Sequence, residues 1–255
     1  MSLQAQKKFY QDNGYLIFNI NDNLLIDKVN NDIEKIIQNE KKIKKNSKIF
    51  SYNDSPRIVE SYKKSINCKL LAKHSKIIEM IKFLYEEEPL AFSTINFLTS
   101  TQQPLHSDYA HFGTIPELLL IGTWIALEDI NPDSGPLQIV PGSHKWDIYR
   151  YSEQDNNKIP TSLDEIKKNY TTYENWVKKN ILKNKAKKLT PAMKKGDCII
   201  WAANLLHGSP DCVVPGSSRK SQATHWTLKN VVKHYNPIFS DLKNSIVVER
   251  KVEYV

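Results

Sequence analysis

Six short runs with the character of β-strands follow one another from residue 90 onward. They cover residues 91–99, 118–130, 135–140, 196–202, 219–228 and 245–252. Glycine and proline turns separate several of these runs, a pattern typical of antiparallel barrels and jelly rolls. We therefore predict a mainly β core of this kind over residues 91–255.

The first 90 residues are patterned for helices instead. A short polar helix is expected before Gly14, and the alternating run YLIFNI at 15–20 predicts a strand. Apolar side chains recur at helical spacing over 22–46, and a second helix is expected over 74–87. Helices followed by strands favour helices packed on the outside of a barrel over alternating βαβ units. The length of 255 residues suits a single domain, 1–255, with about 1–90 as its helical elaboration.

A polar insertion at about 145–190 interrupts the β core. Residues 164–195 hold ten lysines against three acidic residues, a net charge of +7 out of +8 for the whole chain. Helical pieces are expected around 162–185, and the segment is either a lid over a site at the barrel rim or a solvated surface helix. A lid so charged would favour an anionic substrate, and Arg57 is a second candidate contact for an anion.

Composition excludes some partners and compartments. Only four of the 36 basic residues are arginines, and no stripe of arginines and aromatics appears, so we expect no nucleic-acid partner. No run approaches the roughly 18 apolar residues of a membrane span. The first residues lack the apolar run of a signal peptide, and three widely spaced cysteines (Cys68, Cys198 and Cys212) indicate neither disulfides nor a zinc knuckle. We therefore expect a cytoplasmic protein, and the oligomeric state stays open.

A candidate metal site is the main chemical feature. His106 and Asp108 stand two residues apart, so on a strand both side chains would point to one face and reach one metal. His207 follows about a hundred residues later, just after a predicted strand. Two histidines and one carboxylate leave open positions on a metal, the arrangement of non-haem Fe(II) oxygenases, and these positions suit a bidentate 2-oxo acid and O2.

Arg219 supports the same chemistry. It stands twelve residues beyond His207, and strand alternation places Arg219 and Ser221 on one face, where both could point into the barrel. A guanidinium beside a hydroxyl is suited to binding a distal carboxylate such as that of 2-oxoglutarate. The competing interpretation is an arginine on the surface of a strand.

Five motifs resemble the phytanoyl-CoA dioxygenase family, an iron- and 2-oxoglutarate-dependent group with a cupin-type double-stranded β-helix. In chain order they are NGYLIF, LHSD, GTWIALEDINPDSGPLQIVPGSHK, KKGDCIIWAANLLHGS and SRKSQATHW. They extend over residues 9–235. The GPLQIVPGSHK block is the most specific and does not depend on the metal triad. The resemblance implies a jelly-roll core of this cupin type with the N-terminal helices packed outside it.

The resemblance also implies roles for individual residues. His106, Asp108 and His207 match the iron ligands, and Arg219 matches the arginine that pairs with the distal carboxylate of 2-oxoglutarate. Trp124 matches an aromatic wall of the cosubstrate pocket, and Ser209 matches a hydroxyl that touches the cosubstrate. Where the family often has Gln between the first His and Asp, this chain has Ser107, which leaves one cosubstrate contact in doubt.

Several of these residues also have a structural interpretation. Trp124 could equally be a core aromatic, because indoles on strands usually are. Tyr109 and His111 either face the substrate or stabilise a loop, and His225 shares the strand parity of Arg219 and either packs in the core or faces the site. His144 in the PGSH block is expected to be a hydrogen-bonded structural residue.

The resulting expectation is a dioxygenase that uses Fe(II), 2-oxoglutarate and O2 to hydroxylate a small or acyl-type, anionic substrate, releasing succinate and CO2. One alternative is a cupin-type metal-binding protein without oxygenase activity, either an isomerase or a sensor. Another is a non-enzymatic jelly roll that binds carbohydrate or lipid. Neither alternative needs a buried arginine opposite the metal, so Arg219 and Ser221 separate them from the oxygenase.

Overall fold

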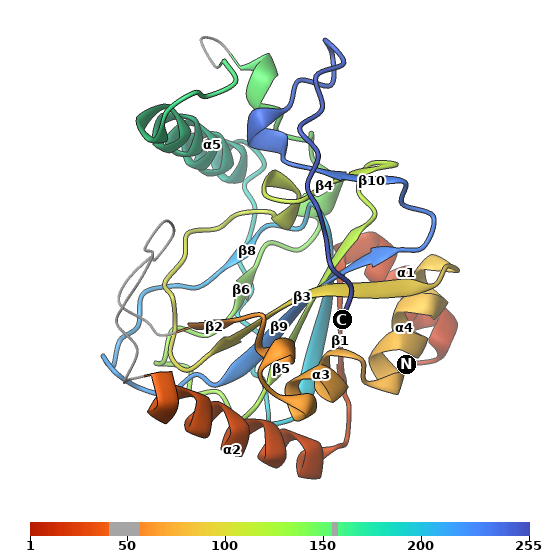
Figure 1. Cartoon of the computed structure of the whole chain (residues 1–255), viewed down its shortest axis with the longest axis vertical. Helices are drawn as coiled ribbons and strands as arrows, with labels where there is room; N and C mark the ends of the chain where they lie inside the picture. The colour runs from red at the N-terminus through yellow and green to blue at the C-terminus, as the bar shows by residue number, and fades with distance from the viewer. Residues whose placement is uncertain (41–56, 155–157) are drawn as a thin grey trace.

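The computed structural model describes residues 1–40, 57–154 and 158–255 (Figure 1). Within them the α-helices are α1 (Leu3–Asn13), α2 (Asn23–Glu40), α3 (Ile66–Ala72), α4 (Ser75–Tyr85) and α5 (Leu163–Lys183). The strands are β1 (Tyr15–Asn19), β2 (Arg57–Val59), β3 (Pro89–Phe97), β4 (Gly113–Ile115), β5 (Leu120–Ala126), β6 (Gln138–Ile139), β7 (Asp197–Ala202), β8 (His207–Gly208), β9 (Ser221–Leu228) and β10 (Lys233–Tyr235).

One large antiparallel sheet organises the molecule. Its strand order is β1-β7-β5-β9-β3-β2, and every residue of the central strands β5 and β9 is buried. Two small antiparallel sheets, β6 with β8 and β4 with β10, accompany it. The predicted antiparallel β core with helices outside it is confirmed at this level.

Alternation along the central strands gives the large sheet two apolar faces. In β5, Ile121 and Ile125 pack in one hydrophobic cluster, whereas Trp124 belongs to another. In β7, Ile200 joins the first cluster and Trp201 the second. Because side chains alternate in direction along a strand, the two clusters lie on opposite faces of the sheet.

Helices cover the first of these faces. Buried residues of α2, α3 and α4, among them Val29, Leu71 and Ile77, pack against it. Figure 1 shows these helices on one side of the sheet and α5 on the other. Asp32 of α2 accepts hydrogen bonds from Ser65 (2.6 Å) and Asn67 (2.8 Å), which join α2 to the start of α3. The second face is thereby left to border a site.

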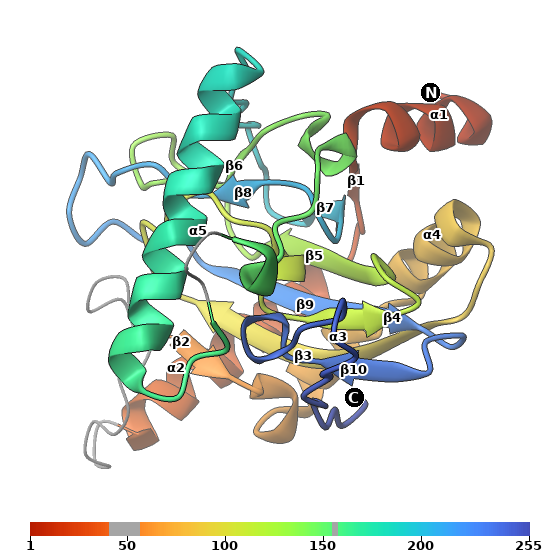
Figure 2. The same cartoon turned by 90° about the horizontal axis from the view of Figure 1, so that it is seen from above.

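The polar insertion forms one long helix, α5. Ser162 caps its N-terminus: the Ser162 hydroxyl accepts a hydrogen bond from the backbone N–H of Glu165. Tyr173 and Val177 are buried against the residues beside β8, while most of the lysines are exposed. Figure 2 shows α5 beside the ends of β6 and β8, so the helix stands at the rim of the β structure.

Some predicted boundaries were wrong. Residues 245–252 form no strand, only isolated bridges such as Tyr235 with Glu249 and Asp241 with Ile246. β4 and β10 were not predicted, because three residues are too few to show an alternating pattern. The predicted helix at 22–46 is confirmed up to Glu40, and its last residues, 41–46, lie outside the described ones. Within the described ranges, no helix combines the length and apolar character needed to cross a membrane.

Candidate active site

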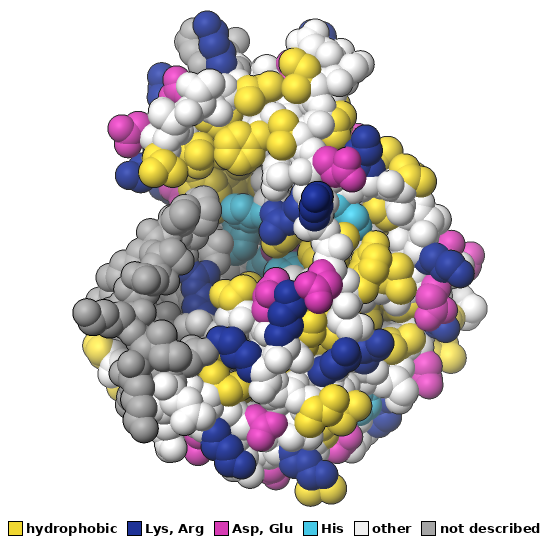
Figure 3. Space-filling view, viewed as in Figure 1, with side chains coloured by type: hydrophobic (Ala, Val, Ile, Leu, Met, Phe, Trp, Pro, Cys, Tyr) yellow, Lys and Arg dark blue, Asp and Glu magenta, His cyan; other side chains and the backbone are white. Residues whose placement is uncertain are grey.

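A cavity of about 310 Å³ lies against the second face of the large sheet. Side chains of β3, β5, β7 and β9 form its floor, among them Phe97, Trp124, Trp201 and Ala223. Residues around β8 and Tyr170 of α5 form the opposite wall. Figure 3 shows the surface hollowed here, with histidine side chains visible inside.

The cavity contains the three predicted metal ligands. His106 and His207 are brought together by a β-bridge, in which His106 N donates to His207 O (2.9 Å) and His207 N to His106 O (2.8 Å). Asp108 does not continue that extended backbone but begins a 3₁₀ turn, Asp108–Ala110. All three side chains are buried, and one ligand atom from each lies within 4.8 Å of the others.

Backbone hydrogen bonds orient both imidazoles for a metal. The Nδ1 atom of His106 lies 2.9 Å from Pro104 O, and that of His207 lies 3.0 Å from Leu205 O. A carbonyl oxygen can only accept, so each Nδ1 carries a proton and each Nε2 is directed at the site. The Gln103 amide lies 3.2 Å from His106 Nε2. Burial lowers the pKa of His207, but Asp108, 3.5 Å from its Nε2, outweighs burial and raises that pKa. Both imidazoles therefore present Nε2 as the atom that a metal would bind.

The third donor is oriented by an indole. Trp201 Nε1 donates to Asp108 Oδ2 at 2.7 Å, while Oδ1 lies 3.5 Å from His207 Nε2. Gly122 on β5 makes this possible, since a Cβ there would come within 2.2 Å of the Trp201 ring. One carboxylate oxygen is thus occupied and the other is presented beside the imidazoles. Two neutral nitrogens and one carboxylate oxygen fit a divalent transition metal.

Electrostatics keep the aspartate charged. Burial alone would raise the pKa of Asp108, but the imidazoles of His207 and His225 hold the pKa of this carboxyl well below its usual value. Burial of His106, with His207 and His111 nearby, lowers the pKa of its imidazole to about 3. The site therefore presents a carboxylate and a neutral His106, the protonation states that ligands need.

We expect Trp201→Phe to weaken Fe(II) binding about 10- to 100-fold, because losing the group that orients a metal ligand has effects of this size. The measurement is calorimetric titration of the metal-free protein. Trp226→Phe is the matched control: its Nε1 donates to Thr123 Oγ1 (3.0 Å), and Trp226 packs in the cluster on the helix-covered face. If both variants bound Fe(II) as wild type does, Trp201 would have no part in positioning Asp108.

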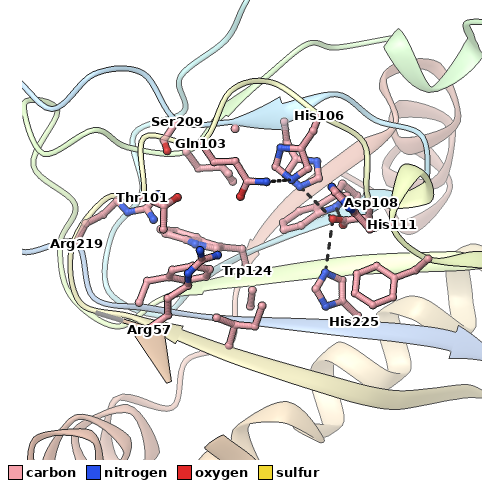
Figure 4. A pocket seen from close by; sticks show the side chains of 18 of the residues that line it. Arg57, Thr101, Gln103, His106, Asp108, His111, Trp124, Ser209, Arg219 and His225 are labelled. Atoms are coloured by element: carbon pink, nitrogen blue, oxygen red, sulfur yellow. Dashed lines mark hydrogen bonds and ion pairs between the residues drawn. The ribbon is translucent and has the colours of Figure 1, made fainter. Parts of the chain in front are cut away.

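Arg219 lies at the far end of the cavity. It is only 3% exposed, and its guanidinium carbon lies 5.6 Å from the Phe97 ring and 5.7 Å from the Trp124 ring (Figure 4). Its Nε has no hydrogen-bond partner, and no carboxylate of the described residues forms an ion pair with it. Burial lowers its pKa to about 10. A buried cation without a counter-ion is costly, so this end of the cavity suits an anion.

The structure brings most of the other predicted cosubstrate residues to this cavity. Trp124 and Ser209 line it, Trp124 beside Arg219. Ser221 does not line it: it is fully buried at the start of β9, and its hydroxyl has no partner. Ala223 and His225, which follow Ser221 on the same face of β9, line the cavity.

Tyr109, His111 and His225, which could have been either site residues or structural residues, differ in where their side chains lie. His111 and His225 line the cavity, and His225 Nε2 lies 3.6 Å from Asp108 Oδ1. Tyr109 faces away from it and hydrogen-bonds Glu117 and Tyr235. His144 contacts Gln11 O (3.1 Å) at the surface, in keeping with its predicted structural role.

Ser107 also turns away from the cavity. Its backbone N–H donates to the Tyr173 hydroxyl of α5 (2.7 Å), and its own hydroxyl lies 3.2 Å from that oxygen. Gln103, three residues before His106, lines the cavity instead. The insertion helix therefore anchors the metal-binding turn directly, which no sequence pattern indicated.

Among the described residues, the cations that line the cavity are arginines and not the lysines of the insertion. Arg57, Arg219 and Arg250 all line it, three of the four arginines in a chain with 32 lysines. From α5 only Tyr170 reaches the lining, so the +7 charge of the insertion does not enter the cavity. Arg250 was missed because it falls within the run at 245–252, which was predicted only as a strand, and no motif surrounds it.

Known proteins resemble the chain over most of its length. The sequence model of the family described as phytanoyl-CoA dioxygenase matches residues 10–221. The human peroxisomal phytanoyl-CoA dioxygenase is 25% identical over 244 residues, which cover 87% of this chain and 67% of that protein. Its bovine counterpart is 23% identical, covering 80% and 62%. An ectoine dioxygenase of Sphingopyxis alaskensis is 23% identical over 170 residues.

Solved structures share the fold. The epimerase SnoN, in complex with Fe³⁺, alpha ketoglutarate and a nogalamycin compound, superposes with a TM-score of 0.67 at 17% identity, covering 98% of this chain and 96% of that one. EctD from S. alaskensis, with 2-oxoglutarate and 5-hydroxyectoine, gives a TM-score of 0.64 at 17% identity, covering 98% and 84%. With the family match over residues 10–221, the class of enzyme predicted from the sequence is confirmed, and the chain belongs to the phytanoyl-CoA dioxygenase family.

Proposed function

We propose that this protein is a non-haem Fe(II)- and 2-oxoglutarate-dependent dioxygenase that hydroxylates a small, anionic molecule. The observation that carries the proposal is the presence, in one cavity, of the His106–Asp108–His207 cluster and the buried guanidinium of Arg219, which forms no ion pair with a carboxylate of the described residues. A metal site alone would serve an isomerase or a sensor equally well. The buried Arg219 separates the oxygenase from these alternatives, because only 2-oxoglutarate has a second carboxylate that must be bound away from the metal.

Each residue then has a defined task. His106, Asp108 and His207 hold the iron on one side and leave the other side open. Arg219 binds the distal carboxylate of 2-oxoglutarate, which supplies the counter-ion that this buried cation lacks. Trp124 forms the wall beside that carboxylate, and Ser209 lies where its hydroxyl can touch the cosubstrate. Ser221 has the least support among these residues, because it does not line the cavity.

Iron held by His106, Asp108 and His207 would, with 2-oxoglutarate and O2, supply the oxidation of a C–H bond, one oxygen atom entering the hydroxyl product and the other succinate, with CO2 released from 2-oxoglutarate. The protein positions the reactants and keeps the cavity dry. The apolar rings of Phe97, Trp124 and Trp201 line the cavity and exclude bulk water. The same sheets would form a double-stranded β-helix, with β6–β8 closing over the large sheet.

The identity of the substrate cannot be inferred from the relatives. The matched proteins are named for phytanoyl-CoA and ectoine, and the similar structures include an epimerase and a carbocyclase from nogalamycin biosynthesis. Function therefore depends on this cavity, whose cations favour an anion. The three cysteines of the protein are free, in keeping with a cytoplasmic location.

The proposal is tested by a screen for succinate formation across carboxylated, phosphorylated and neutral metabolites, each with and without 2-oxoglutarate. We expect succinate to form only when Fe(II), 2-oxoglutarate and O2 are all present, and one substrate class to stimulate it. Asp133→Asn, an exposed aspartate outside the cavity, serves as the control variant. Conversion of a substrate without 2-oxoglutarate would instead favour a cupin-type isomerase.

A further inference from the structure

Arg250 lines the cavity beside His111 and Phe112. Its Nη1 donates to His111 O and to Asn236 Oδ1, both at 3.3 Å. Both hydrogen bonds are long, and both acceptors are neutral oxygen atoms. Within the described part of the chain, no carboxylate forms an ion pair with it. The guanidinium carbon lies 4.1 Å from the centre of the Phe112 ring, and burial lowers its pKa. A half-buried cation thus faces the cavity with capacity to bind.

The position of Arg250 is fixed by the backbone. Its N–H donates to His234 O (2.8 Å), and Asn236 N donates to Val248 O (2.9 Å), so the C-terminal segment is paired with β10 and the residue after it. Stacking on Phe112 further restricts the side chain. Arg250 also lies outside residues 10–221, the part of the chain that matches the family. The motifs that identify the family therefore do not include it.

Arg250 and Arg219 serve different ends of the cavity. Arg219 lies beside Trp124, whereas Arg250 lies over Phe112, whose ring is 4.8 Å from that of His225. Figure 4 shows Arg219 on one side of the cavity and His111 and His225 beside Asp108 on the other. An anion at Arg250 would therefore lie at the end of the cavity that holds His111 and His225, away from the distal carboxylate of 2-oxoglutarate.

The neighbours of Arg250 suit a small organic anion. The Tyr170 and His111 rings lie 5.5 Å apart and offer a hydroxyl and an imidazole nitrogen beside their apolar faces. Phe112 covers one face of the guanidinium and Nη1 is used by His111 and Asn236, which leaves the edge formed by Nε and Nη2 for two parallel hydrogen bonds to an oxyanion. Lysine would offer a point charge without this planar selectivity.

We propose that Arg250 binds the oxyanion of the primary substrate, a carboxylate or a phosphate, while the apolar body of the substrate lies against Phe112 and Tyr170. This places the group to be oxidised toward His106, Asp108 and His207. The inference rests on the proposed function, since it assigns 2-oxoglutarate to Arg219 and leaves Arg250 for the substrate.

The test measures binding without turnover. The anaerobic protein with Fe(II) and saturating 2-oxoglutarate, which occupies the Arg219 end, is titrated calorimetrically with benzoate, phenyl phosphate and the neutral benzamide. We expect wild type to bind one of the two anions at least about tenfold more tightly than benzamide, the effect of a charged hydrogen-bonded pair. Whether benzoate or phenyl phosphate binds more tightly tells a carboxylate substrate from a phosphate.

Arg250→Gln should abolish that preference and change the affinity for 2-oxoglutarate less than about twofold. Arg250→Lys should keep part of the preference, which guards against a folding defect, and Lys251→Gln, an exposed neighbour, should keep all of it. The inference is overturned if Arg250→Gln retains the preference or if wild type has none. The proposed function fails separately, if the Fe(II) protein does not bind 2-oxoglutarate in the same samples.

Discussion

Replacing Arg219 with alanine is expected to raise the KM for 2-oxoglutarate by roughly 30-fold to several thousand-fold. Removing one partner of a buried, hydrogen-bonded charge pair costs about 2–5 kcal/mol, and each 1.4 kcal/mol is a factor of ten. Arg219 is almost completely buried and has no counter-ion among the described residues, so the carboxylate of 2-oxoglutarate would lose a buried cationic partner. Steady-state kinetics with varied 2-oxoglutarate measure the effect.

The neighbouring residue provides the matched control for this prediction. Lys220 pairs with Glu34 on the outside of the protein (3.0 Å), so Lys220→Ala should leave this KM within about twofold. A second comparison uses 2-oxobutyrate, which lacks the distal carboxylate. Wild type should strongly prefer 2-oxoglutarate over it, and Arg219→Ala should lose most of that preference. An unchanged KM and preference in Arg219→Ala would remove Arg219 from the cosubstrate site.

Replacing Asp108 has the other large expected effect. Asp108→Ala should bind Fe(II) at least about 100-fold more weakly and lose turnover by roughly a thousand-fold or more, because the site would keep only two neutral ligands. Calorimetric titration with Fe(II) and succinate assays measure the two quantities.

Asp108→Asn sharpens this test. Asparagine keeps the shape of the side chain and an oxygen that can accept from Trp201 Nε1, but it lacks the charge. It should therefore fold as wild type does and still fail to load iron. If Asp108→Asn bound Fe(II) and turned over normally, the carboxylate would not be a ligand.

The sequence was most informative where function depends on residue types at fixed spacing. His106, Asp108, His207 and Arg219 lie in one cavity, as their motifs suggested. Strand parity was the wrong reason, because Asp108 begins a 3₁₀ turn and Arg219 precedes β9. The structure adds the reason that the ligands meet: the His106–His207 bridge pairs two segments a hundred residues apart.

Residues that act through tertiary contacts could not be predicted in this way. Trp201 reaches Asp108 only because Gly122 on the neighbouring strand leaves space for its indole. Tyr173 reaches Ser107 from the middle of α5, in a segment whose sequence shows mainly its lysines. Neither pairing leaves a pattern in one strand or one helix.

Charge counted along the chain was a poor guide to the cavity. The lysines of 164–195 dominate the net charge, but the cavity is lined by arginines from three separate places in the sequence, Arg57, Arg219 and Arg250. A helix can carry many charges on its exposed side and present only an aromatic residue, here Tyr170, to a site. The division into one domain over 1–255 stays a prediction.

The most direct test of iron and 2-oxoglutarate binding in one cavity is the visible absorption of the anaerobic protein. Adding Fe(II) and 2-oxoglutarate together should produce a metal-to-cosubstrate charge-transfer band that neither produces alone. Asp108→Asn should abolish the band, and Arg219→Ala should require far more 2-oxoglutarate to reach it. A native, Fe(II)-loaded protein that shows no such band at saturating 2-oxoglutarate would contradict the proposed function.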